Sequence, residues 1–107
     1  MRQGKVYNND LFAGIITESD AENYIFNYDD AYFYNTTLPP ISVTLPKSRQ
    51  HHYSKELFPF FFNILSEGAN RNLQCRILKI DEEDDFGLLL KTAGSETIGA
   101  IHVQEIK

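Results

Sequence analysis

Of the residues that could carry chemistry, the acidic run from Asp81 to Asp85 is the densest group. Alternating carboxylates could ligate calcium, but an EF-hand loop needs glycine at its sixth position and glutamate at its twelfth. Counted from Asp81, these positions hold Phe86 and Thr92. We therefore interpret the run as a helix start, with Asp81 or Asp84 as the N-cap and the negative charges close to the positive end of the helix dipole.

The triplet Asp85-Phe86-Gly87 matches the metal-binding triplet of protein kinases. In kinases this triplet works only together with a glycine-rich loop, a strand lysine and a catalytic-loop aspartate, and the sequence has none of these. A chain of 107 residues is also far too short for a kinase. We therefore interpret Asp85 as a charge in the first turn of a helix.

The histidines and the single cysteine do not form a pattern typical of a metal site or a nucleophile. His51 and His52 are adjacent and so point in different directions in most backbones, and His102 is distant in the sequence. Cys75 has no histidine near it, so we expect a structural or incidental thiol. Nucleophile elbows, phosphate-binding glycine loops and dinucleotide fingerprints are absent from the sequence. We predict no catalytic, metal-binding or cofactor-binding residues, and hence no enzyme.

Composition and charge restrict the remaining classes of function. A net charge of −5 argues against direct binding of nucleic acid, because phosphate contacts need a basic surface. The first residues lack the apolar core of a signal peptide, and no window is apolar enough to span a membrane. One cysteine fits a reducing compartment. We expect a cytoplasmic protein with a single domain over residues 1–107.

The stretch Leu57–Gly68 is the most apolar and contains four of the eight phenylalanines. Proline suits the first turn of a helix, so we predict a helix that begins at or just before Pro59 and stops at Gly68. At helical spacing, Phe62 and Ser66 point away from the main apolar face. That face comprises Phe58, Phe61, Ile64 and Leu65. A helix that is apolar on two faces predicts a second contact surface, covered either by the domain's own loops or by another chain.

Alternating apolar and polar residues predict a small antiparallel sheet. Its hairpin turns at Asn9-Asp10, and a short strand bounded by prolines is best placed at an edge. The predicted strands are Lys5–Asn8, Leu11–Thr17, Tyr24–Tyr28, Ile41–Leu45 and Thr97–Gln104. Between them, Asp29–Thr37 is a loop or a short helical turn, and Lys47–Ser54 is a surface loop.

Two more helices are predicted after Gly68. The first, Ala69–Ile80, is amphipathic, with one apolar stripe formed by Ala69, Leu73, Ile77 and Ile80. The second follows the acidic run, stops at Gly94 and carries Phe86, Leu89, Leu90 and Ala93. The predicted fold class is α+β: a small antiparallel sheet of the N-terminal hairpin, middle strands and C-terminal strand, packed with about three helices between residues 55 and 94.

The segment Pro59–Gly68 resembles the signature of the N-terminal domain of HipA-type kinases, in which a proline, two phenylalanines, an asparagine, two aliphatic residues and Pro-Glu-Gly recur. Ser66 stands where the family usually has proline, and Asp10 where it usually has a hairpin glycine. Other parts of the family pattern are similar to Val6–Gly14, Ser42–Pro46, Asp84–Leu89 and Ile98–Ala100. The resemblance covers nearly the whole chain.

This resemblance implies a free-standing version of a domain that packs against the ATP-binding side of a serine/threonine kinase toxin. In the split form of these toxin–antitoxin modules, a small chain similar to this one, a separate kinase chain and a helix-turn-helix DNA-binding protein act together. The residues that the resemblance and the two-faced helix assign to partner binding are Phe60, Phe62, Asn63, Ser66, Glu67 and Gly68.

The first hypothesis is therefore a non-catalytic subunit that binds, regulates and neutralises a separately encoded HipA-like kinase. Inhibition, activation and stabilisation of the kinase are all compatible with such binding. The alternatives are a regulatory component of a DNA-bound toxin–antitoxin repressor complex, a small binding module unrelated to kinases, and a small-molecule or metal-binding enzyme.

Overall fold

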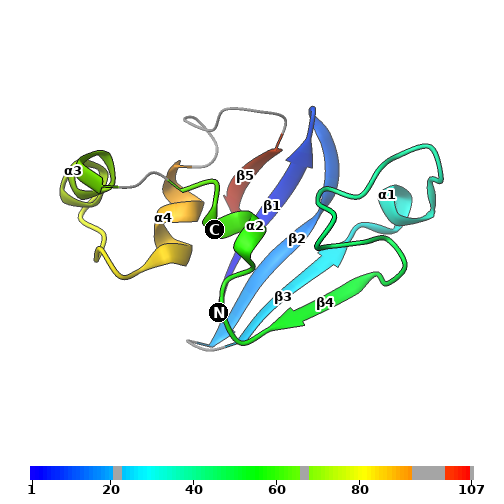
Figure 1. Ribbon diagram of the computed structural model, residues 1–107, viewed down its shortest axis with the longest axis horizontal. Coiled ribbons are helices and arrows are strands. Elements are labelled where there is room, and N and C mark those ends of the chain that lie inside the picture. The colour runs from blue at the N-terminus through cyan, green and yellow to red at the C-terminus, as the bar shows by residue number, and fades with distance from the viewer. Residues whose placement is uncertain (21–22, 66–67, 93–100, 107) are drawn as a thin grey trace.

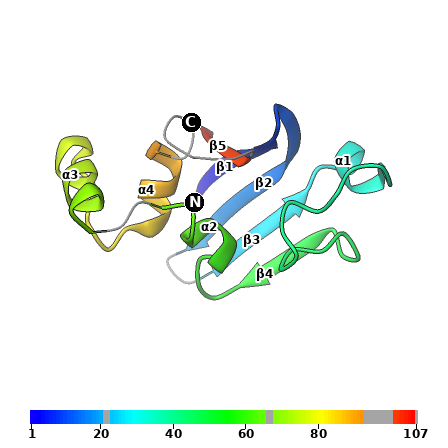
Figure 2. The ribbon, with the colours of Figure 1, turned by 45° about the horizontal axis from the view of Figure 1, so that its top comes forward.

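The computed structural model describes residues 1–20, 23–65, 68–92 and 101–106. These residues form one five-stranded antiparallel sheet and four helices, which confirms the predicted α+β class. The elements in chain order are β1 (Arg2–Asn8), β2 (Leu11–Asp20), β3 (Asn23–Tyr28), α1 (Asp30–Tyr34), β4 (His51–Ser54), α2 (Pro59–Phe62), α3 (Gly68–Leu78), α4 (Asp85–Thr92) and β5 (Ile101–Ile106). Helices α2 and α4 lie over one face of the sheet, and α3 lies at the end of the molecule beyond α4 (Figures 1 and 2).

The predicted N-terminal hairpin is confirmed, and its turn is of the type that suits twisted strands. Asn9 and Asp10 have φ angles of 50° and 71°, so both adopt the left-handed conformation that a two-residue type I′ turn requires. Further along β2, Gly14 lies against β3. A Cβ atom at Gly14 would lie 2.2 Å from the carbonyl oxygen of Asn27, so only glycine allows the two strands to approach this closely.

The sheet has the strand order β4-β3-β2-β1-β5. The C-terminal strand therefore returns to the sheet, as predicted, and pairs with β1 in the register that sets Val103 opposite Val6. Both valines are buried. The first part of the predicted strand, Thr97–Ala100, lies outside the described residues, as do Ala93 and Gly94.

The predicted edge strand Ile41–Leu45 is wrong, because this segment is a turn. The Tyr28 hydroxyl holds it: it accepts the N–H of Ile41 at 3.1 Å and donates to the carbonyl oxygen of Leu45. Ile41 and Leu45 are buried, whereas Val43 is 91% exposed, although a strand would place all three on one face. The edge strand is instead β4, which lies within the segment predicted as a surface loop.

The predicted helix from Pro59 to Gly68 is also wrong in its extent. Helix α2 ends at Phe62, and the N–H groups of Ile64 and Leu65 then bond to the carbonyl oxygens three residues back, which tightens the chain into turns. Gly68 begins α3 rather than ending a helix.

Helix α3 ends two residues earlier than predicted. Lys79 has a φ of 57°, and the N–H of Ile80 donates to the carbonyl oxygen of Cys75 at 2.9 Å, which is the pattern of a left-handed helix C-terminus. The predicted apolar stripe of this helix does not face the core: Leu73 is 52% and Ile77 68% exposed. Cys75, on the opposite side of the helix, is buried instead.

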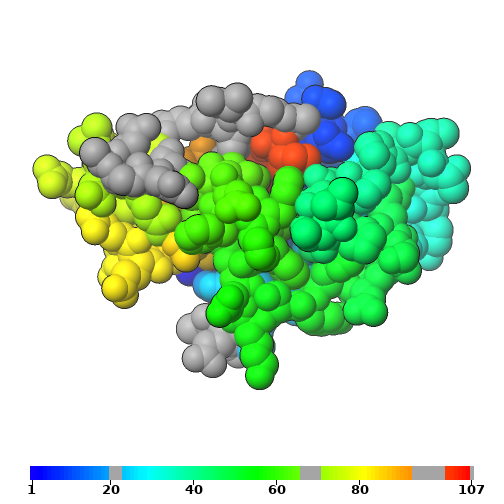
Figure 3. Space-filling model, in the orientation of Figure 1, coloured from blue at the N-terminus to red at the C-terminus, as the bar shows by residue number. Residues whose placement is uncertain are grey.

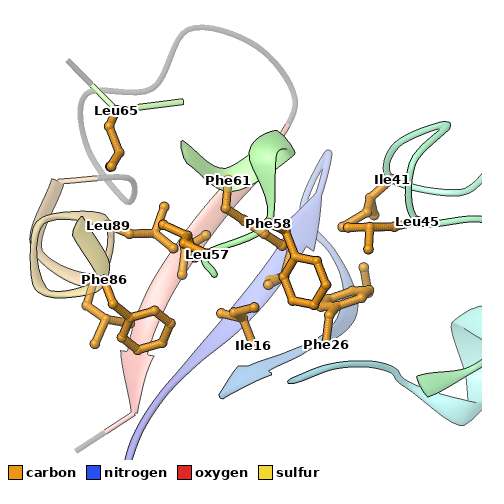
Figure 4. Packing of buried hydrophobic residues seen from close by; sticks show 14 of the residues in the cluster. Ile16, Phe26, Ile41, Leu45, Leu57, Phe58, Phe61, Leu65, Phe86 and Leu89 are labelled. Carbon is orange, nitrogen blue, oxygen red and sulfur yellow. The ribbon is translucent and has the colours of Figure 1, made fainter. Parts of the chain in front are cut away.

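The core lies between the sheet and helices α2 and α4. Phe61 is completely buried, and its ring centroid lies 5.8 Å from that of Phe26 on β3 (Figure 4). Phe58 and Leu65 are also buried, so the predicted inward face of the phenylalanine-rich segment is confirmed. The face of α4 toward the sheet contributes Phe86, Leu88 and Leu89 to the same cluster.

Candidate partner-binding surface

The short helix α2 separates neighbouring phenylalanines onto opposite sides. Pro59 occupies its first turn, where its missing N–H costs no hydrogen bond, and Phe61 then points into the core. The next ring, Phe62, is 42% exposed, and Asn63 beside it is also exposed. Phe60 is half-buried and packs against the core, with its ring centroid 5.2 Å from that of Phe61.

The six predicted partner-binding residues differ in exposure and in the element to which they belong. Phe62 and Asn63 lie together at the surface, whereas much of Phe60 is used by the core. Ser66 and Glu67 lie outside the described residues, and Gly68 is the first residue of α3. Phe62 is therefore the largest apolar group of the predicted set that the structure presents to solvent.

Phe62 lines a groove of about 460 Å³ at the surface. Its other lining residues come from β3, the segment before α2, the first residue of α2 and the start of α4: Tyr24, Lys55, Glu56, Leu57, Pro59 and Asp85. Figure 3 shows the surface hollowed between the green segment that carries α2 and the yellow segment that precedes α4. An apolar ring beside charges of both signs is a suitable arrangement for a protein partner, because the ring supplies contact area and the charges orient the partner.

Sequence reasoning missed Tyr24, Lys55 and Asp85 as members of this site. They come from three separate segments, and no local motif relates them. The signal available in the sequence was the pair Lys55-Glu56 next to the phenylalanine-rich stretch, which places charges beside an apolar segment.

Tyr24 in the groove is held in its neutral form. Its hydroxyl donates to the carboxylate of Glu18 at 3.2 Å. Burial, together with the negative charge and hydrogen bond of Glu18, raises the pKa of Tyr24 to about 12. The tyrosine therefore presents a protonated hydroxyl and an apolar ring to the groove at any physiological pH.

The acidic run beside the groove is structural. Arg2 donates from Nη1 and Nη2 to both carboxylate oxygens of Asp84, at 2.8 and 2.9 Å, and from Nε to Glu18 at 2.8 Å. Asp84, one of the two predicted N-cap residues, also accepts the N–H of Gly87 at 3.1 Å and so caps the helix. The hydrogen bonds from Arg2 lower the pKa of Asp84 below its ordinary value. Asp85 forms an ion pair with Arg71 of α3.

The other residues considered for chemistry take structural positions. His51 and His52 point to different partners, the Asn27 side chain and the carbonyl oxygen of Pro46. Cys75 is a free, buried thiol. Within the described ranges, no three histidine, cysteine or acidic side chains lie close enough together to hold a metal ion.

We compared the chain with known protein families and solved structures, and the results agree with its hairpin, phenylalanine-rich helix and closing strand. The model of the HipA N-terminal domain family matches residues 4–104. The chain belongs to this family. A solved structure of the N-terminal domain of HipA toxin superposes with a TM-score of 0.75 at 28% identity, and the match covers 100% of this chain and 94% of that one.

Two relatives similar to this chain differ in length. An uncharacterized protein of Haemophilus influenzae is 32% identical over 107 residues, which cover all of this chain and 95% of the relative. A protein of Sinorhizobium fredii, named "Putative kinase Y4mE", is 30% identical over 78 residues, which cover 73% of this chain but only 18% of the relative. Among the described helices of this HipA N-terminal domain, none is both long and apolar enough to cross a membrane.

Proposed function

We propose that residues 1–107 form a single HipA N-terminal-like domain that acts as a non-catalytic subunit: it binds a separately encoded HipA-like serine/threonine kinase and neutralises it. The observation that carries this proposal is the 42% exposure of Phe62 at the rim of a groove, in a member of the HipA N-terminal domain family. A large apolar ring presented at the surface by the end of a short helix is the kind of anchor that dominates protein interfaces.

The two relatives support a partnership with a kinase. The region similar to this chain makes up 18% of the Sinorhizobium protein, whose name describes it as a kinase. The Haemophilus relative, in contrast, has almost the same length as this chain. A region similar to this chain therefore lies both within a much longer chain and in a short one, which supports a short chain that supplies its contacts to a kinase as a separate subunit.

The groove suggests how binding would be organised. Phe62 would enter an apolar pocket of the kinase, and the neighbouring Lys55 and Glu56 would pair with charges at the edge of the contact. Since Tyr24 stays protonated and donates its hydroxyl proton to Glu18, it would contribute its ring and an uncharged hydrogen-bond acceptor. Neutralisation would follow from the bound subunit holding the kinase in one conformation or covering its substrate site.

Co-expression with the kinase chain tests this proposal. We expect the wild-type chain to co-purify with the kinase and to reduce its phosphorylation of a protein substrate. Phe62→Asp places a charge at the centre of the contact and should weaken binding by about 30-fold or more. The matched control is Val43→Asp, because Val43 is apolar, 91% exposed and outside the groove. A wild-type chain that never co-purifies with the kinase would overturn the proposal.

A further inference from the structure

Within the part of the chain that the structure describes, helix α3 carries an apolar stripe whose side chains are largely exposed. Leu73 and Ile77 are four residues apart and therefore neighbours on one side of the helix, and they are 52% and 68% exposed. The sequence pattern of this helix is typical of one that buries this side. The structure has the reverse arrangement, because over residues 71–78 of this helix, where burial is described, the buried side chain is Cys75.

The contacts that hold α3 to the body lie on the side away from this stripe. Cys75 packs into the core cluster, and Arg71 donates to the carbonyl oxygen of Glu82 and to the carboxylate of Asp85. At 100° per residue, Cys75 and Arg71 both lie about 160° from Leu73. The stripe is thus directed away from the core, at the end of the molecule where Figures 1 and 2 place α3.

The charges around the stripe restrict what can cover it. Helix α3 contains no acidic residue although the chain has a net charge of −5, and Arg76 is exposed beside Leu73 and Ile77. Lys79 is exposed just after the helix. A symmetric contact with a second copy would set the same patch against itself, so Arg76 would meet the cations of the copy with no carboxylate on the helix to offset them.

We infer that the apolar stripe of Leu73 and Ile77, together with Arg76 beside it, docks into an apolar groove edged by carboxylates on the partner chain. The two aliphatic side chains fill the groove, and Arg76 pairs with a carboxylate at its edge. This inference rests on the proposed function, since the partner is the same kinase chain. It adds a second contact, made by α3, to the one made by Phe62.

The test is the dissociation constant of the full chain for the kinase, measured by isothermal titration calorimetry at two salt concentrations. We expect Leu73→Glu/Ile77→Glu to weaken binding at least tenfold, and Arg76→Glu to weaken it in a way that rising salt diminishes. Arg76→Lys should retain most of the affinity. The matched controls are Val43→Glu and Arg49→Glu, at exposed positions outside α3, which should bind like the wild type. Because the substituted side chains are exposed, the unfolding midpoints should stay unchanged.

The outcomes separate this inference from the proposed function. If the wild type binds the kinase and the double variant binds equally well, the α3 contact is overturned and the proposed function stands. If the wild type does not bind, both are overturned. If the free wild type dimerises and the double variant is monomeric, the stripe is covered by a second copy, and the inference is wrong.

Discussion

Arg2 connects the first strand to the start of α4 through a single carboxylate. Its two hydrogen bonds lower the pKa of Asp84, so the folded state favours the ionised form of this side chain. A lowered carboxyl pKa stabilises the fold at pH values above the unfolded pKa of about 3.9, and this contribution is lost as the pH falls through the folded pKa.

We therefore expect Asp84→Asn to lower the free energy of unfolding by about 1 kcal/mol at pH 6, and by progressively less below pH 4. Asparagine keeps the oxygen that caps the N–H of Gly87 but loses the charge and one acceptor for Arg2, so the difference reports the ion pair together with one of its hydrogen bonds. Urea unfolding at a series of pH values measures it. Glu82→Gln, at an exposed carboxylate in the same run, is the control. A deficit that stays constant down to pH 2 would contradict the role given to Arg2.

In the segment from Ile41 to Leu45, the Tyr28 hydroxyl supplies backbone hydrogen bonds of the kind that a neighbouring strand would supply. It accepts one backbone N–H and donates to one backbone carbonyl, and the tyrosine is buried. Tyr28→Phe leaves both backbone groups without this partner, so we expect a loss of about 1–3 kcal/mol in the free energy of unfolding. Thermal or urea unfolding checks this value. Tyr34→Phe, at a 72% exposed ring, should change stability by less than about 0.5 kcal/mol.

At the scale of elements, the β1–β2 hairpin has a turn residue that is not the best one for its conformation. Asp10 has a φ of 71°, which glycine adopts without steric cost. We expect Asp10→Gly to raise the free energy of unfolding by about 0.5 kcal/mol. The same replacement at Asp30, in the first turn of α1, should lower it. A destabilised Asp10→Gly variant would show that the aspartate side chain makes an additional contribution to the turn.

The elements that the sequence predicts well are those with local signals. The hairpin was predictable because Asn9-Asp10 separates two alternating segments, and β3 because its aromatic residues alternate. Strand β4 was missed because its sequence, His51–Ser54, is polar and short, and only pairing with the edge of β3 makes it a strand. The strand pattern at Ile41–Leu45 was misleading because a distant side chain, Tyr28, satisfies its backbone.

The candidate site was predictable to a similar extent. Helical spacing correctly separated Phe61 from Phe62, since it depends only on the local backbone. The other groove residues, such as Tyr24 and Asp85, come together only through the tertiary fold. The periodicity of α3 predicted an amphipathic helix correctly but assigned its stripe to the wrong surroundings, because a pattern shows that a side chain needs cover and not which surface covers it.

At the scale of the whole molecule, the protein is a two-layer domain with exposed apolar groups at its surface. The sheet and the helices α2 and α4 bury Phe61, Phe26 and Phe86 in a single core. Phe62 and the α3 stripe lie outside this core and are exposed. A domain of the HipA N-terminal family with such groups at its surface is suited to act as one part of an assembly.

The most direct test of the central claim is the affinity of the purified chain for the kinase across a graded series at one position. We predict that Phe62→Leu, Phe62→Ala and Phe62→Asp weaken binding in that order, up to about 30-fold or more, and that each variant stays folded although the loss of the buried part of the ring lowers its unfolding free energy. Val43→Asp should bind like the wild type. Equal affinity of the wild type and Phe62→Asp would contradict the claim that this ring anchors the kinase.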